Sequence, residues 1–137
     1  MRRLGVVAIA ALLAGTIAAP VSAGSSALEG TWSSIDPVDG SAQHLSIRGS
    51  AGHVQMTYVD EYATTCVLEG APTVAFTGVL TGGIDGNELV GWWKSASCGS
   101  QLILRASYRF AWIFEYDPNT DTLWGAVNDG PATWYRD

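Results

Sequence analysis

The amino-acid sequence predicts an all-β protein with about eight short antiparallel strands, closed into a barrel or, alternatively, folded as a β-sandwich. Two observations predict this fold class. Apolar and polar residues alternate with a period of two in several short segments, and turn residues such as Asp-Gly and Asp-Pro separate those segments. No segment has the apolar spacing of three and four residues that is typical of an amphipathic helix.

The first 23 residues have the features of a secretory signal peptide. A cationic start is followed by an apolar run over residues 4–19, and residues 21–23 form a small-x-small cleavage site. We therefore expect residues 1–23 to be a signal peptide and residues 24–137 to form one domain, secreted to the extracellular space or the cell envelope. No later apolar run has the length of a membrane span, so we expect no membrane association after cleavage.

The expected strands follow the alternation in order along the chain, and each is bounded by a turn signal. They are residues 30–35, 44–48, 54–58, 73–80, 89–94, 102–116, 122–127 and 133–136. The alternation over residues 102–116 is longer than an ordinary strand. We therefore expect a bent strand there, or two strands joined by a bulge.

Charge excludes two classes of partner. Two of the seven Lys and Arg residues belong to the expected signal peptide, which leaves five in the mature chain. The mature chain also contains all 13 Asp and Glu residues, so its net charge is −8. A nucleic-acid-binding protein needs clustered cations, and anionic membrane surfaces also attract cationic proteins. We therefore expect neither nucleic acid nor membrane as a partner.

The chain has two cysteines, Cys66 and Cys98. In an exported protein the expected state is a disulfide between them. Two cysteines and two separated histidines do not form a structural zinc set, which needs four close ligands, so we expect no metal and no cofactor.

Both ends of the predicted domain carry a short motif. Gly30-Thr31-Trp32 opens the first expected strand, and Trp134-Tyr135-Arg136 closes the last. This pattern resembles that of the calycins, the lipocalin and avidin group of β-barrels. The resemblance implies that Arg136 lies across Trp32 at one end of a barrel. The avidin biotin-binding residues do not match this chain, so biotin binding is not carried over. The chain also resembles small exported bacterial β-proteins of unassigned function, which share the Asp-Thr-Leu hairpin of residues 121–123.

Six tryptophans are many for a chain of this length. Trp92 and Trp93 are adjacent in an expected strand, so their side chains point to opposite faces, and one of them lies under the Cys66 loop, lines a cavity or meets solvent. We expect Trp112 in the core and Trp124 at the surface. The residues that we expect to contact a ligand are aromatic and come from different strands: Trp92, Trp93, Trp112, Tyr58 and Phe76.

Other polar residues are weaker candidates for a site. Asp117, Asn119 and Asp121 have the spacing that opens a calcium loop, but the required glycine and glutamate are missing, so a hairpin turn is the preferred interpretation. His44 and His53 lie on adjacent expected strands and are interpreted as separate surface residues.

Asp60, Glu61 and Glu69 flank the Cys66 loop, where a carboxylate pair is a candidate for acid–base chemistry on a glycoside.

The chain has neither a Gly-x-Ser-x-Gly nor a His-Glu-x-x-His motif, so no local motif indicates catalysis. We therefore expect a non-catalytic protein that binds a small apolar or aromatic ligand in a barrel mouth. One alternative is a module that binds an extracellular protein, such as an exported protease or hydrolase inhibitor whose free arm, residues 24–29, enters the partner's cleft. A second alternative is an enzyme that acts on polysaccharide.

Overall fold

The computed structural model describes residues 26–50, 52–63, 66–67, 74–105, 111–127 and 130–137. These residues contain nine β-strands and no α-helix. The strands are β1 Gly30–Ile35, β2 Ala42–Ser50, β3 His53–Asp60, β4 Phe76–Asp85, β5 Glu88–Cys98, β6 Gln101–Arg105, β7 Ala111–Asp117, β8 Thr122–Val127 and β9 Gly130–Arg136.

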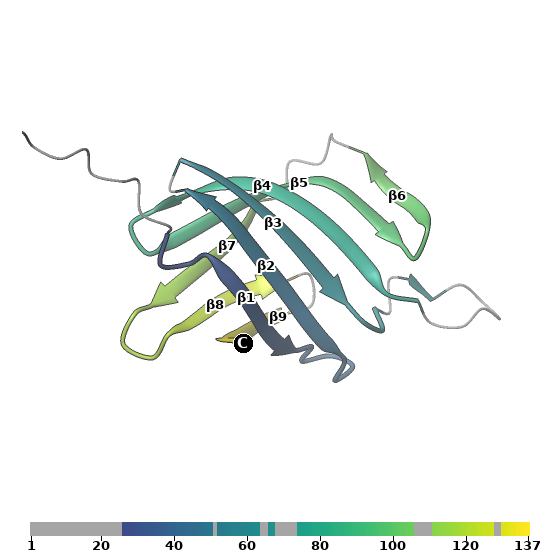
Figure 1. Ribbon diagram of the computed structural model, residues 1–137. Helices are drawn as coiled ribbons and strands as arrows, with labels where there is room; N and C mark the ends of the chain where they lie inside the picture. The colour runs from purple at the N-terminus through teal and green to yellow at the C-terminus, as the bar shows by residue number, and fades with distance from the viewer. Residues whose placement is uncertain (1–25, 51, 64–65, 68–73, 106–110, 128–129) are drawn as a thin grey trace, which may run out of the picture.

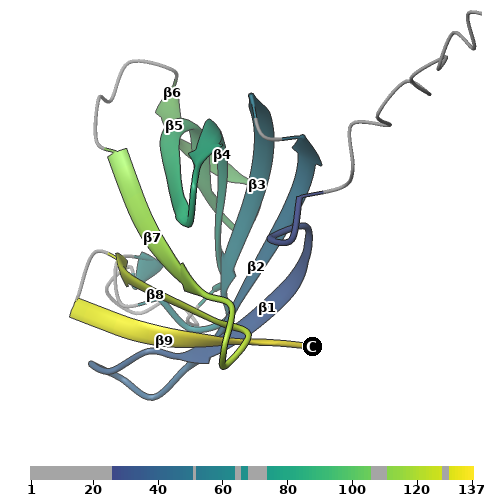
Figure 2. The same cartoon turned by 90° about the vertical axis from the view of Figure 1, so that its left-hand side faces the viewer.

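Eight of these strands close a barrel (Figures 1 and 2). Among the described residues each strand pairs antiparallel with the next along the chain, except that β6 does not pair with β7; β5 pairs with both of them. The ring closes where β1 pairs with β9, and the ninth strand, β6, extends only the end of β5. The predicted barrel is therefore confirmed, and the alternative β-sandwich is not formed.

Alternation along the strands builds the core. Every second residue of β3 is buried, and the same holds through most of β1, β2, β5, β7 and β9. The inward positions carry large apolar and aromatic side chains, and these form one buried hydrophobic cluster. Trp112 is 4% exposed and Trp124 is 55% exposed.

The two ends of the barrel differ. At the hairpin end, on the left of Figure 1, tight turns join β2 to β3, β4 to β5 and β7 to β8. Gly86 has a φ of 60° in the β4–β5 turn, which agrees with the Asp-Gly signal in the sequence. At the loop end, on the right, lie the β1–β2 turn, the end of β3 and the start of β4.

The predicted disulfide is confirmed at the loop end. Cys66 and Cys98 are bonded, with their Cα atoms 5.4 Å apart. Cys98 is the last residue of β5 and pairs with Phe76, the first residue of β4. The disulfide therefore ties the segment that follows β3 to the β4–β5 pair, and it suggests an oxidising, extracellular environment.

The long alternating segment forms two strands, β6 and β7, which agrees with one of its two expected forms, and the residues between them, 106–110, lie outside the described residues. Two other sequence expectations need correction. Residues 26–28 are not a loose arm, because Leu28 is 2% exposed and packs in the core. Trp92 is not covered by the Cys66 loop, since 48% of its surface is exposed. The expected signal peptide also lies outside the described residues.

Candidate functional site

The hairpin end is closed by the turn before β1 and by the last residues of β9. Leu28 O accepts a hydrogen bond of 3.1 Å from Trp32 Nε1. The Cζ atom of Arg136 lies 4.2 Å from the centroid of the Trp32 ring, which is a cation–π geometry. These contacts join the start of the domain to its last strand.

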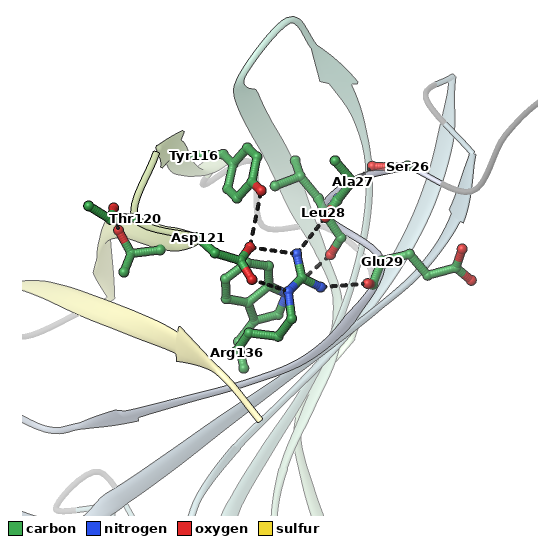
Figure 3. A network of polar contacts seen from close by, with 10 residues as sticks. Ser26, Ala27, Leu28, Glu29, Tyr116, Thr120, Asp121 and Arg136 are labelled. Atoms are coloured by element: carbon green, nitrogen blue, oxygen red, sulfur yellow. Dashed lines mark hydrogen bonds and ion pairs between the residues drawn. The ribbon is translucent and has the colours of Figure 1, made fainter. Parts of the chain in front are cut away.

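Arg136 is held by a network of hydrogen bonds (Figure 3). Its Nε and Nη2 donate to the two carboxylate oxygens of Asp121 at 2.8 and 2.9 Å, and its Nη1 and Nη2 donate to the carbonyl oxygens of Glu29 and Ala27. The Tyr116 hydroxyl donates to Asp121 at 3.0 Å. The hydrogen bond from Arg136 holds the pKa of Asp121 below its usual value. All of these partners belong to the chain itself, so the network accounts for barrel closure rather than for ligand binding.

The loop end has a different character, because buried polar side chains lie inside the barrel there. We call this group the polar tier: Ser34, Asp36, Ser41, Gln43 and Asp60, each at most 7% exposed. They continue the inward alternation of their strands, since Ser34 follows Trp32 on β1, Gln43 precedes Leu45 on β2 and Asp60 follows Tyr58 on β3. Gln43 is paired with Ser34 on one side and with Asp60 on the other.

Hydrogen bonds connect the polar tier. Gln43 Nε2 donates to Asp36 Oδ2 at 2.8 Å, and Ser41 Oγ donates to Asp60 Oδ1 at 2.7 Å. The backbone N–H of Val38 donates to Asp36 Oδ1 at 2.6 Å. In the described part of the chain, neither Asp36 nor Asp60 has a cationic partner. The two carboxyl groups are therefore buried with only neutral donors around them.

Among the side chains that the structure describes, two buried polar atoms lack a hydrogen-bond partner, Gln43 Oε1 and Trp134 Nε1. Ser34 lies between the two residues, because it pairs with Gln43 on β2 and its Oγ donates to Thr133 O, next to Trp134 on β9. The Gln43 amide has one suitable orientation, because only its Nε2 group donates to the Asp36 carboxylate. The result is one unpaired acceptor and one unpaired donor inside the barrel. Such atoms are rare, because each costs about 1–3 kcal/mol when it is buried without a partner.

Aromatic side chains border the polar tier. Tyr58 contacts Trp112, Phe76 and Trp134, with ring centroids 4.9 to 6.1 Å apart in edge-to-face geometry. Trp93 contacts Trp112 at 4.5 Å and Phe76 at 5.7 Å. The structure therefore brings together four of the five expected ligand-contacting residues, Tyr58, Phe76, Trp93 and Trp112, in one aromatic cluster.

Gly78 and Asp60 connect this aromatic cluster to its surroundings. A Cβ atom at Gly78 would lie 1.9 Å from the Trp93 ring, so the glycine makes room for that indole. The Tyr58 hydroxyl lies 3.4 Å from Asp60 Oδ2, where the cluster meets the polar tier. The fifth expected residue, Trp92, points outward and is separate from the cluster.

The other titratable candidates lie apart from the polar tier. His44 pairs with Val59 and His53 with Ser50, so the two histidines are at opposite ends of the β2–β3 hairpin. His44 Nδ1 lies 3.1 Å from Ser33 Oγ, and its Nε2 lies 3.5 Å from Glu61 Oε1. This arrangement is exposed on the outer face.

The calcium-like spacing forms a turn. Asp117 accepts a hydrogen bond from the backbone N–H of Asn119, which lowers the pKa of Asp117, and Asp121 is bound to Arg136. The described residues contain no group of three or more potential metal-ligating His, Cys, Asp or Glu side chains. Glu69 lies outside them.

Comparison of the chain with protein-family models, with curated proteins and with solved structures finds no significant match. The closed eight-stranded antiparallel barrel is consistent with a calycin-like fold. Within the described residues, no helix has the length and hydrophobicity needed to cross a bilayer.

Of the polar tier, the sequence indicated only Asp60 as a candidate, because the alternation was followed through apolar residues alone. The signal is in the sequence: polar residues occupy the same alternate positions as the core residues, at 34 and 36 after Trp32 and at 60 after Tyr58. A polar residue that continues an inward alternation is either paired inside the protein or available to a ligand. In the polar tier some polar atoms are paired inside the protein, and Gln43 Oε1 is unpaired.

Proposed function

We propose that this protein is a secreted, non-catalytic binding protein that holds a small ligand at the loop end of the barrel, between the polar tier and the aromatic cluster. The observation that carries the proposal is the pair of unpartnered buried atoms, Gln43 Oε1 and Trp134 Nε1. A folded chain rarely leaves an acceptor and a donor unpaired in the same region of its interior, and a bound ligand that pairs with both removes that cost.

The surrounding groups define the ligand. It carries an N–H or O–H donor for Gln43 Oε1 and an acceptor for Trp134 Nε1. It has an apolar or aromatic part that packs against Tyr58, Trp112 and their neighbours. The buried carboxyl groups of Asp36 and Asp60 disfavour an anion, so the ligand is neutral or cationic.

The disulfide and the expected signal peptide support secretion as the route to this function. An inhibitor that inserts its N-terminal arm has less support. Such an arm must leave the barrel, whereas Ala27 and Glu29 are bound to Arg136 and Leu28 is buried.

Native mass spectrometry of the mature protein, purified from its own secretion medium, tests the proposal. We expect an added mass that is lost on denaturation, and we expect Trp134→Phe to lower its occupancy strongly. Trp32→Phe is the matched control, because Trp32 is equally buried but its Nε1 already donates to Leu28 O. A bare protein, or equal occupancy in the two variants, contradicts the proposal and assigns the two unpaired atoms to internal water.

A further inference from the structure

A second candidate site lies on the outer face of the barrel. A groove of about 630 Å³ runs over β4 and β5 near the hairpin end. Its lining comes from β3, β4 and β5 and from Gly52 in the β2–β3 turn, and the residues used below are His53, Thr81, Gly82, Gly83, Asp85 and Trp92. Its volume is in the range of small-molecule sites, about 300–1,000 Å³.

The groove exists because β4 carries two consecutive glycines, Gly82 and Gly83, in this stretch. Gly82 pairs with Gly91, and Gly83 pairs with Val90. A Cβ atom at Gly82 would lie 1.8 Å from Val90 O, so β4 and β5 approach closely only because this residue is glycine. Gly83 has no side chain to fill the space beside Trp92 and Val90. The floor of the groove is therefore backbone.

Trp92 forms one side of this groove, and its side chain takes no part in packing the core. Its neighbour Trp93 supplies the inward indole, whereas Trp92 is opposite Thr81 on β4 and is 48% exposed. Exposing a large apolar ring costs free energy unless a ligand or partner covers it. His53, Thr81 and Asp85, whose side chains can form hydrogen bonds, line the same groove. The groove therefore combines one exposed indole with residues that can bind hydroxyl groups.

We propose that this groove binds a neutral carbohydrate chain, with the apolar C–H face of one pyranose ring stacked on Trp92. A sugar ring presents an apolar face and a rim of hydroxyl groups, and the groove offers an indole together with donors and acceptors at its edge. Asp85 and the net charge of −8 of the expected mature chain disfavour an acidic glycan. A stable protein partner needs about 800 Å² on each side, which is much more than one indole and its rim provide.

Binding of cellohexaose and of the hexamer of N-acetylglucosamine, measured by isothermal titration calorimetry, tests this proposal. We expect one of the two to bind and Trp92→Ala to weaken it by roughly tenfold or more, since a central aromatic anchor dominates small interfaces. Trp92→Tyr keeps a stacking ring and should retain part of the affinity. Trp124→Ala is the matched control, because Trp124 is a similarly exposed tryptophan on β8 and does not line the groove.

Three outcomes contradict the carbohydrate site. The first is no binding of either hexasaccharide, and the second is equal loss of binding in Trp92→Ala and Trp124→Ala. The third is self-association of the wild-type protein in sedimentation velocity that Trp92→Ala abolishes, which would make this face an interface between copies. The site is independent of the barrel interior, so Trp134→Phe should leave carbohydrate binding unchanged.

Discussion

The guanidinium of Arg136 lies 4.2 Å from the centre of the Trp32 ring, so the last strand of the barrel covers the first. The same guanidinium binds Asp121 in the β7–β8 turn and two carbonyl oxygens of the turn before β1. One side chain thus connects three segments that are distant in sequence, at the place where β1 and β9 close the ring. Closure of the barrel should therefore depend on it.

Replacing Arg136 is expected to weaken the folded state. Arg136→Ala removes the cation–π contact and the hydrogen bonds to Glu29 and Ala27, and we expect the free energy of unfolding to fall by about 2 kcal/mol. Arg136→Lys keeps the charge but loses the planar fork, so its effect should be intermediate. Urea unfolding measures both variants. Lys94→Ala removes an exposed cation and should change stability little, and an equal loss in Lys94→Ala and Arg136→Ala would contradict the assignment.

The Arg136–Asp121 pair also predicts an acid dependence. The hydrogen bond from Arg136 lowers the pKa of Asp121 below its usual 3.8 in the folded state, so the unfolded chain binds more protons in that range. Stability from this group is complete above the usual value and is lost as the pH falls through the lower, folded value. The lowered pKa values of Asp39 and Asp117, which follow from hydrogen bonds with Ser41 and Asn119, act in the same direction.

Urea unfolding at about pH 6 and about pH 3 measures this dependence. Asp121→Asn should reduce the difference in unfolding free energy between the two pH values. In an Arg136→Ala background the same substitution should have little effect on that difference, because the pKa shift of Asp121 comes first from Arg136. An undiminished acid dependence in Asp121→Asn would show that other groups cause it.

The sequence predicts the barrel because its alternation reports directly which residues face inward. Trp93 and Trp112 lie inside and Trp124 outside, as the period of two requires. The turn before β1 was mispredicted, because Leu28 is a single apolar residue in its segment and the carbonyl groups of its two neighbours are bound by Arg136, 108 positions after Leu28 in the chain. A local sequence pattern gives no information about a contact between residues that are so far apart in the chain.

The candidate site could be predicted only in part. The alternation along the strands indicates which aromatic rings share the interior. Inward positions of different strands carry Tyr58, Phe76, Trp93 and Trp112. The alternation does not indicate which polar atoms find partners, because that depends on register. Gln43 Nε2 reaches Asp36 across a turn, whereas its Oε1 reaches no partner. Such a difference between two atoms of one amide has no sequence signal.

The disulfide should contribute a large part of the stability of the loop end. Cys66 and Cys98 are 32 positions apart, and in the chain-entropy model a loop of that size stabilises the folded state by about 3–4 kcal/mol. We expect the double variant Cys66→Ala/Cys98→Ala to lose approximately that much in urea unfolding. Wild-type protein unfolded in the presence of a reductant should behave like the variant. A stability unchanged in both would contradict the prediction.

Asp36 controls which atom of the Gln43 amide is unpaired. In Asp36→Asn the side-chain oxygen continues to accept from the backbone N–H of Val38, so an NH₂ group replaces the oxygen that faces Gln43 Nε2. Two NH₂ groups do not bond each other, and we expect the Gln43 amide to rotate so that its Oε1 accepts from the introduced NH₂ group and its Nε2 becomes the unpaired atom. The barrel interior then offers two unpaired donors, at Gln43 and Trp134, and no unpaired amide acceptor.

Proton NMR of the Gln43 side-chain amide measures this rotation. Its proton signals should move upfield in Asp36→Asn, because they lose a charged acceptor. Asp39→Asn is the matched control in the same turn, where the carboxylate accepts from the backbone N–H of Ser41 and does not touch Gln43, so the signals should stay in place. Unshifted signals in Asp36→Asn would mean that Gln43 keeps its orientation. Gln43 Oε1, the acceptor that we assign to the ligand's donor, would then remain unpaired whether or not Asp36 is present.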